Sequence, residues 1–328
     1  MHNNYLFISI YFFSLGILLI KLLKNISLRR KILYIKGMSH IGGLGIGALF
    51  LIASIIALFI FKTSHKLLLG ILIPSMAILF FEIIDDKNEF SVKQKFLIQI
   101  ISASLLILAG IRTQIVYIGD TANIIITFIW VIGITNAFNH LDIMDGLAAA
   151  IAAIISFSFY ITAIITDNPP IAFLSSSLTG ITLSFFAYNL PPAKIYMGNS
   201  GSHFLGFVFS AIALVMNYAS LEKKIALLNP LFILGLPILD TAFVMLMRIK
   251  KGRSALEKSN DHLALRFLKS GYSKKQTLVY MSSMAAILAL SGILLKSLPN
   301  FIDYLIICLI IAASFKLLKK MGKINIES

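Results

Sequence analysis

The sequence predicts an all-α polytopic integral membrane protein with about eleven membrane-spanning helices. Its mean hydropathy is +0.91, and 58% of its 328 residues are hydrophobic. Only 13% are charged, whereas soluble domains carry roughly 25%. The apolar residues also gather in runs of about 20, the length that crosses a hydrocarbon core of roughly 30 Å. We therefore expect one multi-pass domain over residues 1–328.

The predicted spans lie near residues 4–24, 43–61, 67–84, 96–111, 122–138, 146–166, 171–189, 203–219, 225–247, 277–295 and 301–318. No basic segment precedes the first span and no small-residue cleavage site follows it, so we expect this span to remain in the mature protein. The single cysteine, Cys308, lies inside the last span, which argues against disulfides.

The distribution of Lys and Arg predicts the orientation of the chain. If the N-terminus faces outward, 23 of the 29 basic residues fall on the inner connections and only 6 on the outer ones. We therefore expect the N-terminus outside and the C-terminus in the cytoplasm. The net charge of +15 then reflects topology and attraction to anionic membrane lipid. Nucleic acid is not an expected partner, because no basic stretch is interleaved with aromatic residues.

Four polar stretches that are distant in sequence fall on the predicted cytoplasmic side. They are residues 80–95, 136–150, 189–206 and 248–276. Carboxylates at a membrane boundary are costly unless they are paired, hydrated or bound to a ligand, so such residues are functional candidates. We therefore expect a site on the cytoplasmic face that these four connections build together.

Two of these stretches indicate phosphate and a cation. The neighbouring Asp85 and Asp86 repel each other unless a cation or a base shares them. The segment 198–202, GNSGS, opens the eighth span, and a glycine-rich helix start presents N–H groups suited to phosphate. Hard oxygen ligands from Asp and Asn suit Mg²⁺, which also bridges to substrate phosphates.

Four motifs follow one another along the chain: the Asp pair, N-x-x-N-x-x-D-x-x-D-G at 136–146, M-G-x-S-G-S at 197–202 and a basic loop bearing His and Arg. This ordered set resembles the polyprenyl-phosphate N-acetylhexosamine-1-phosphate transferases of glycosyltransferase family 4. SHIGGLGI at 39–46 and LPILDT at 236–241 agree with it. The resemblance covers about residues 30–280, the motif-bearing core.

This resemblance implies a bacterial plasma-membrane enzyme. Such an enzyme transfers a HexNAc 1-phosphate, most often GlcNAc 1-phosphate, from a UDP-sugar to undecaprenyl or another polyprenyl phosphate. UMP is released, and a lipid-linked cell-envelope glycan is initiated. The implied cofactor is Mg²⁺, with Mn²⁺ as an alternative, and a homodimer is one alternative for the oligomeric state.

The resemblance also implies roles for individual residues. It makes Asp85, Asp86 and His262 catalytic and Asn139 and Asn199 metal ligands. The implied substrate-binding residues are Lys95, Asn136, Asp142, Asp145 and Arg266. Phosphoryl transfer needs positioning and charge neutralisation more than covalent machinery, and this set of residues suits that demand.

The chain departs from the family pattern in two places. Asn199 stands where the family usually has Asp, and Ala264 and Leu265 stand where it usually has histidines after His262. We expect Asp142 or Asp145 to supply the missing negative charge. A catalytically impaired relative of the family is the corresponding alternative.

Two other classes of membrane protein compete with this interpretation. DIMDGLAAA at 142–150 resembles the start of the signature of CDP-alcohol phosphotransferases, but Ala150 replaces its Arg and residues 151–166 hold no carboxylate. A transporter would place polar residues at mid-span and show an internal repeat, and neither is evident. Asp240, inside the ninth predicted span, either lines the same cavity or pairs with a neighbouring helix. His40, His140 and His203 are expected at the inner face.

Overall fold

The computed structural model describes residues 5–35, 37–216, 224–254, 260–295, 298–324 and 326. Within them the chain is helical apart from one short hairpin and the connections. It divides into two compact units, Met1–Met216 and Asn217–Ser328, which are described separately below. Lys36, Lys223, Lys258 and Lys296, which entered the charge count, lie outside the described residues.

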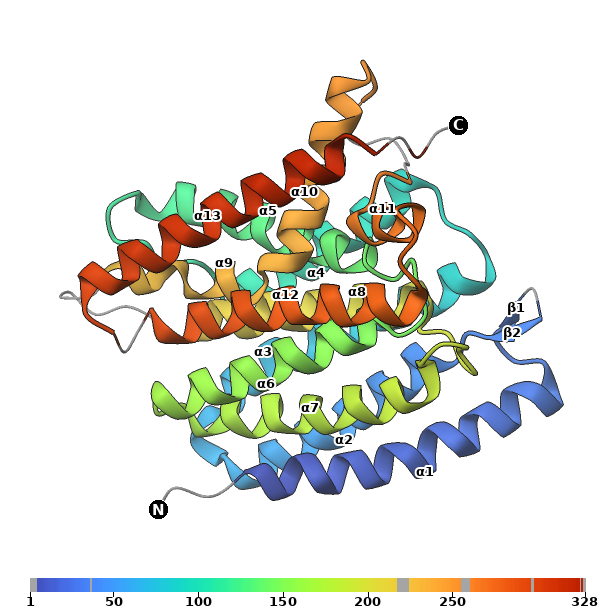
Figure 1. Cartoon of the computed structure of the whole chain (residues 1–328). Helices are drawn as coiled ribbons and strands as arrows, with labels where there is room; N and C mark the ends of the chain where they lie inside the picture. The colour runs from blue at the N-terminus through green and yellow to red at the C-terminus, as the bar shows by residue number, and fades with distance from the viewer. Residues whose placement is uncertain are drawn as a thin grey trace. The chain divides into compact units, whose positions relative to one another are not determined.

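The first unit contains eight helices among its described residues (Figure 1). Their bounds are α1 Leu6–Arg30, α2 Gly42–Ile60, α3 His65–Lys87, α4 Val92–Leu108, α5 Gly119–Asn139, α6 Leu147–Ile165, α7 Pro169–Asn189 and α8 Gly198–Val215. A short 3-10 helix, η1 Lys62–Ser64, precedes α3, and the strands β1 Tyr34–Ile35 and β2 Met38–Ser39 pair antiparallel.

The described part of the second unit also consists of helices. Their bounds are η2 Lys224–Leu228, α9 Asn229–Ile233, α10 Gly235–Lys250, α11 Leu263–Lys269, α12 Lys274–Leu294 and α13 Asn300–Gly322. In this unit α12 packs against α9, α10, α11 and α13.

The prediction of an all-α polytopic membrane protein is confirmed. Every predicted span overlaps a helix, and nine helices of the described chain are long and apolar enough to cross a membrane. The fourth predicted span falls on α4, which has only 17 residues. The ninth falls on α9 and α10, which are bent by 76° at a break. The count of eleven stays a prediction.

Pro237 and Gly235 lie near the break between α9 and α10. Pro237 lies in the first turn of α10, where its missing N–H costs no helical hydrogen bond. Gly235 packs so closely on α12 that an added Cβ would lie 3.2 Å from a Leu288 side-chain atom. A continuous apolar run of this length does not reveal such a bend, because hydropathy depends on residue composition and not on the direction of the helix axis.

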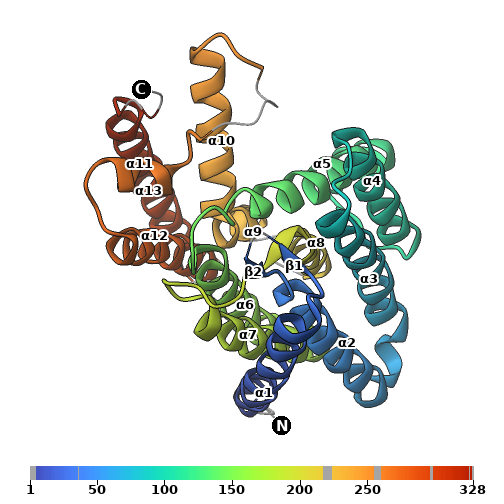
Figure 2. The same ribbon diagram turned by 90° about the vertical axis from the view of Figure 1, so that its right-hand side faces the viewer.

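Helix α8 lies at the centre of the first unit. It packs against α2, α3, α5 and α6, as the end-on view shows (Figure 2). All residues from Ser200 to Ala213 are buried. The close approach of α5 requires Gly206, since a Cβ there would lie 2.8 Å from the Thr135 Cα. On the other side, α7 lies between α1 and α6 (Figure 1).

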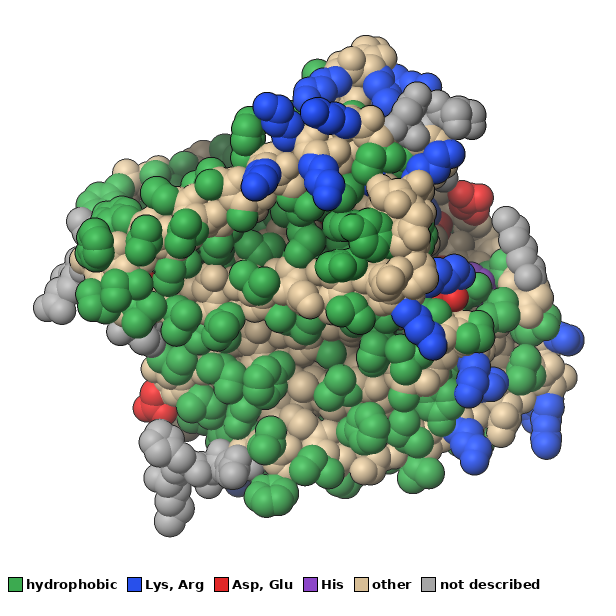
Figure 3. All heavy atoms as spheres, in the orientation of Figure 1, with side chains coloured by type: hydrophobic (Ala, Val, Ile, Leu, Met, Phe, Trp, Pro, Cys, Tyr) green, Lys and Arg blue, Asp and Glu red, His purple; other side chains and the backbone are tan. Residues whose placement is uncertain are grey.

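The surface matches a hydrocarbon solvent rather than water. Hydrophobic side chains cover the flanks of the helices, and Lys and Arg gather near helix ends (Figure 3). On α1, for example, Phe7 is 72% and Leu18 66% exposed, whereas Arg29 and Arg30 lie in the last turn. The chain is therefore a multi-pass membrane protein, and many of its described basic residues lie near the ends of its helices.

Candidate active site

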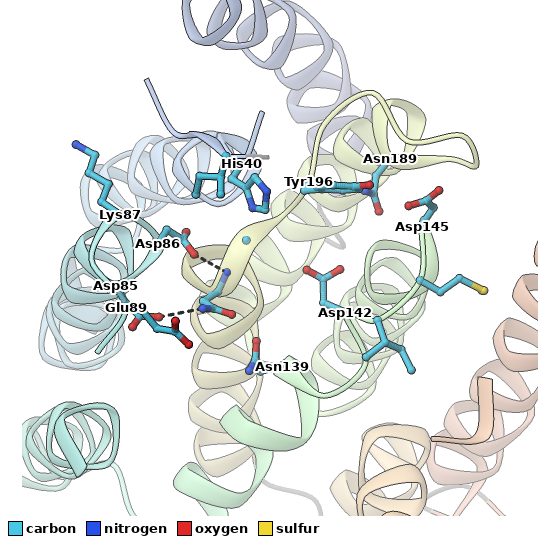
Figure 4. A pocket seen from close by; sticks show the side chains of 15 residues that line it. His40, Asp85, Asp86, Lys87, Glu89, Asn139, Asp142, Asp145, Asn189 and Tyr196 are labelled. Atoms are coloured by element: carbon cyan, nitrogen blue, oxygen red, sulfur yellow. Dashed lines mark hydrogen bonds between the residues drawn. The ribbon is translucent and has the colours of Figure 1, made fainter. Parts of the chain in front are cut away.

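A polar cavity of about 620 Å³ opens at one end of the first unit. The ends of α3, α5 and α7 and the start of α8 contribute to it (Figure 4). Its lining includes Ile35, His40, Asp85, Asp86, Lys87, Glu89, Asn139, Asp142, Ile143, Met144, Asp145, Asn189, Tyr196, Gly198 and Asn199. Three of the four polar stretches thus meet, as the sequence predicts. The fourth belongs to the second unit.

Asp85 lies on the last turns of α3 with its side chain buried. Its Oδ1 accepts a hydrogen bond from the Phe90 backbone N–H at 2.7 Å. Its Oδ2 lies 2.7 Å from the Lys95 Nζ and accepts a hydrogen bond from the Asn199 Nδ2 at 2.9 Å. The carboxylate is therefore oriented by three donors, one of them a cation.

Asp86 caps the N-terminus of α8. Its two carboxylate oxygens accept hydrogen bonds from the backbone N–H groups of Asn199, at 2.9 Å, and Ser200, at 3.2 Å. Gly198 makes this approach possible, since its φ is +74° and an added Cβ would lie 2.7 Å from the Asp86 Oδ2. The structure corrects one expectation here. Two of the N–H groups that the sequence suggested for phosphate, those of Asn199 and Ser200, donate to Asp86.

The glycine pair Gly42–Gly43 holds the start of α8, which carries Asn199. The two N–H groups donate to the backbone oxygens of the residues just before α8, Tyr196 at 3.1 Å and Met197 at 2.9 Å. A Cβ on Gly43 would lie 2.4 Å from the Gly201 nitrogen, so a larger residue would push the start of α8 away. Beside this contact, the His40 ring packs edge-on against the Tyr196 ring at 5.3 Å. Burial lowers the pKa of His40.

The connection between α5 and α6 adds an amide and two carboxylates to the cavity. The Oδ1 of Asn139 accepts a hydrogen bond from the Ser202 hydroxyl at 2.6 Å. The Oδ2 of Asp145 accepts one from the Ala193 N–H at 3.4 Å. Burial raises the pKa of Asp142 to about 7, with further contributions from the carboxylates of Asp86 and Asp145. Negative charge therefore accumulates on this side of the cavity.

Asn189 is a lining residue that the sequence did not single out. Its Oδ1 accepts a hydrogen bond from the Gly146 N–H at 2.9 Å, and its Nδ2 donates to the Ile195 oxygen at 2.8 Å. It therefore joins the end of α7 to the start of α6. Its position two residues before the Pro-Pro pair in NLPPAK was the available signal, because a polar residue ended a long apolar run there.

Two predicted substrate-binding residues of the first unit lie outside the cavity lining. Lys95 reaches the site through Asp85, and its side chain is 23% exposed. Asn136 exchanges hydrogen bonds with Gln99 of α4, at 2.7 Å and 3.3 Å, and donates to the Ile132 oxygen. Its amide thus joins α4 to α5, and contact with a nucleotide sugar stays a prediction.

In the second unit, His262 is held by Asp240. The His262 Nδ1 lies 2.7 Å from the Asp240 Oδ2, and the Leu263 N–H donates to the Oδ1 at 2.8 Å. Both side chains are buried. Of the two alternatives left open for Asp240, the structure shows pairing with a neighbouring segment. A carboxylate on Nδ1 fixes the orientation of the imidazole ring.

Arg266 makes structural contacts in the described residues. Its side chain is fully buried, and its guanidinium donates to the backbone oxygens of Met321, Ile324 and Asp261 and to the Asp261 carboxylate. These bonds fasten α11 to the end of α13. Contact with a diphosphate would require this network to open, so that role stays a prediction.

Comparisons with known proteins agree with the motifs. The chain matches the model of glycosyl transferase family 4 over residues 68–217. It is 31% identical over 299 residues to a probable undecaprenyl-phosphate N-acetylglucosaminyl 1-phosphate transferase of Bacillus subtilis (strain 168), covering 88% of this chain and 82% of that protein. A decaprenyl-phosphate N-acetylglucosaminephosphotransferase of Mycobacterium tuberculosis (strain H37Rv) is 27% identical over 298 residues, covering 80% and 73%. A phospho-N-acetylmuramoyl-pentapeptide-transferase of Staphylococcus haemolyticus is 32% identical over 233 residues, covering 64% and 70%.

Proposed function

Because the chain belongs to glycosyl transferase family 4, we propose that it is a polyprenyl-phosphate sugar-1-phosphate transferase that uses UDP-N-acetylglucosamine. The observation that carries this proposal is the meeting of three motif-bearing segments in one cavity of carboxylates and amides. Two relatives named for N-acetylglucosamine align with 88% and 80% of the chain. Their likeness over most of the chain supports the simpler sugar.

The proposed reaction joins a lipid phosphate oxygen to the phosphorus that bears the sugar. The bond from that phosphorus to the oxygen of UMP breaks, and UMP leaves with the electron pair. Asp85, held by Lys95 and Asn199, is proposed to orient the attacking phosphate. Asp86 fixes the start of α8 and so holds Asn199 beside the reacting groups. Reactions of this type depend on such positioning and on charge neutralisation.

The donor set of the cavity fits Mg²⁺ or Mn²⁺. No group of three His, Cys, Asp or Glu side chains within the described residues is arranged to hold a metal. Mg²⁺ does not need one, because it keeps several waters and uses one or two carboxylates with substrate phosphates. We propose that Asn139 and Asn199 lie nearest to it and that Asp142 or Asp145 adds charge. When bound, the ion would neutralise charge on the diphosphate.

The remaining assignments belong to the same proposal. His262, oriented by Asp240, is the proposed catalytic residue of the second unit. The cavity is proposed to face the cytoplasm of a bacterium, with the N-terminus outside, in keeping with the charge bias. The polyprenyl chain would then lie in the bilayer and the UDP-sugar would enter from the cytosol.

The test is a transfer assay with purified protein in lipid nanodiscs. Radiolabelled UDP-N-acetylglucosamine, undecaprenyl phosphate and Mg²⁺ should yield a labelled lipid and UMP, and Asp85→Asn should lower turnover by orders of magnitude. UDP-N-acetylgalactosamine and UDP-MurNAc-pentapeptide are the competing donors. Product from a competitor alone would overturn the sugar assignment. Substrate binding without product from any donor would identify a catalytically impaired relative.

A further inference from the structure

A buried carboxylate and a buried histidine face each other inside the first unit. The Oε2 of Glu82 on α3 lies 2.9 Å from the Nδ1 of His203 on α8. The side chains are 0% and 2% exposed. Neither residue lines the cavity described above.

The surroundings of this pair make it a poor source of stability. The neighbouring residues Ile78, Leu79 and Phe204 are buried and apolar. Replacing a buried ion pair by apolar residues is often neutral or stabilising, because the charges lose their hydration. Within the described residues, moreover, no group donates a hydrogen bond to the buried Oε1 of Glu82. An unsatisfied buried acceptor adds to the cost.

The pair is in register with the catalytic carboxylates. Glu82 precedes Asp85 by three residues on α3, and His203 follows Asn199 by four residues on α8. Residues at these spacings share a helix face. The Glu82–His203 contact and the Asp85–Asn199 contact therefore join the same two helices about one turn apart. A slide of one residue, roughly 1.5 Å along the axis, turns a side chain by about 100° and would break both contacts.

We propose that Glu82 and His203 are positioning residues of the transfer site. Their bond sets the register and rotation of α3 against α8, and this holds the Asp85 carboxylate at the Asn199 amide. The proposal rests on the proposed function for its kinetic consequence. Its structural part, the dependence of the Asp85–Asn199 contact on the buried pair, stands independently.

The kinetic test compares an apolar double variant, Glu82→Met with His203→Leu, with a reversed pair, Glu82→His with His203→Glu. The apolar variant should fold with an unchanged or higher Tm, yet lose about tenfold or more in kcat with both KM values within about twofold, because misplacement slows the reaction. The reversed pair should recover most of that loss. Ser9→Ala is the matched control, since it removes a buried contact between α1 and α7 and should leave kcat unchanged.

A second measurement needs no substrate. Asn199→Ala should lower the Tm of the otherwise wild-type protein by a few degrees, about 2–4 °C for a bond of roughly 1 kcal/mol. In the apolar double background the same substitution should leave Tm unchanged, because Asn199 no longer meets Asp85. Coupled residues give such non-additive shifts.

Three results would overturn the proposal. They are wild-type kcat in the apolar double variant, a reversed pair as slow as that variant, and an equal Tm loss for Asn199→Ala in both backgrounds. If the wild-type protein turned over no donor, the proposed function would fail alone. The Tm comparison would still decide whether the pair positions Asn199.

Discussion

Replacing Asp86 should destabilise the protein as well as slow it, because the structure makes this carboxylate the cap of α8. Its two oxygens accept hydrogen bonds from the N–H groups of Asn199 and Ser200. Loss of an N-cap costs about 0.5–2 kcal/mol, and loss of a negative charge at a helix N-terminus about 0.3–1 kcal/mol more. Asp86→Ala should therefore cost about 1–3 kcal/mol in unfolding free energy. Asp86→Asn keeps one acceptor oxygen and should cost less.

The assay is thermal unfolding in detergent, followed by circular dichroism at 222 nm. At about 2–4 °C per kcal/mol, Asp86→Ala should lower Tm by roughly 2–12 °C, and transfer activity should fall by orders of magnitude. Ser273→Ala is a matched control, because Ser273 caps α12 through the Gln276 N–H at 3.2 Å. It should cost about 1 kcal/mol without changing turnover. An unchanged Tm for Asp86→Ala, beside a lowered Tm for the control, would refute the capping role.

Four further outcomes follow from the site. The pKa of Asp142 is raised to about 7 by burial and nearby carboxylates, so its contribution to stability is present below about pH 4 and is lost as the pH rises through 7. Asp142→Asn should remove this decline when Tm is measured against pH in the presence of EDTA. A wild-type slope of Tm against pH in the variant would contradict this expectation. Asp240→Asn should lower kcat about tenfold or more by misorienting His262, and wild-type kcat would refute the orienting role. Gly198→Ala should lower Tm, because φ is +74° at this position and an added Cβ would meet the Asp86 carboxylate. Backbone strain of this kind costs about 1–3 kcal/mol. An unchanged Tm would show that the backbone around residue 198 adapts, and would refute the requirement for glycine. Asn199→Asp should lower the Mg²⁺ concentration that gives half-maximal turnover, because the added carboxylate binds Mg²⁺ more tightly, and Asn199→Ala should raise it. The same Mg²⁺ dependence in both variants would refute a metal role for Asn199.

The membrane spans could be predicted because they depend on short-range properties. An apolar run of about 20 residues must cross or leave the bilayer, and the runs that became α1, α2, α5 and α13 needed no tertiary information. The bend between α9 and α10 was not predicted. Near this bend Gly235 packs closely on α12, and sequence periodicity does not contain that contact.

The members of the cavity could be predicted more readily than their partners. Topology and motif order brought Asp85, Asn139 and Asn199 into one cavity. The sequence did not indicate that Asp86, 113 positions from Asn199, would take the N–H groups expected to bind phosphate. Nor did it indicate that Arg266 would be buried against the backbone of α13's end. Motifs indicate the residue types that a site needs. Which acceptor each N–H group binds depends on the three-dimensional packing, and the motifs do not specify that.

The adjacent carboxylates show what this means for charge in the site. Side by side in sequence, Asp85 and Asp86 appeared to need a shared cation. In the structure each has its own compensation, since Lys95 pairs with Asp85 and the N-terminus of α8, with its partial positive charge, receives Asp86. Charge in the cavity is still not fully compensated, because burial and the carboxylates of Asp86 and Asp145 raise the pKa of Asp142 to about 7. Under the proposed function, a divalent cation bound among these carboxylates would relieve their repulsion, while Asp85 keeps the fixed orientation that a reacting phosphate requires.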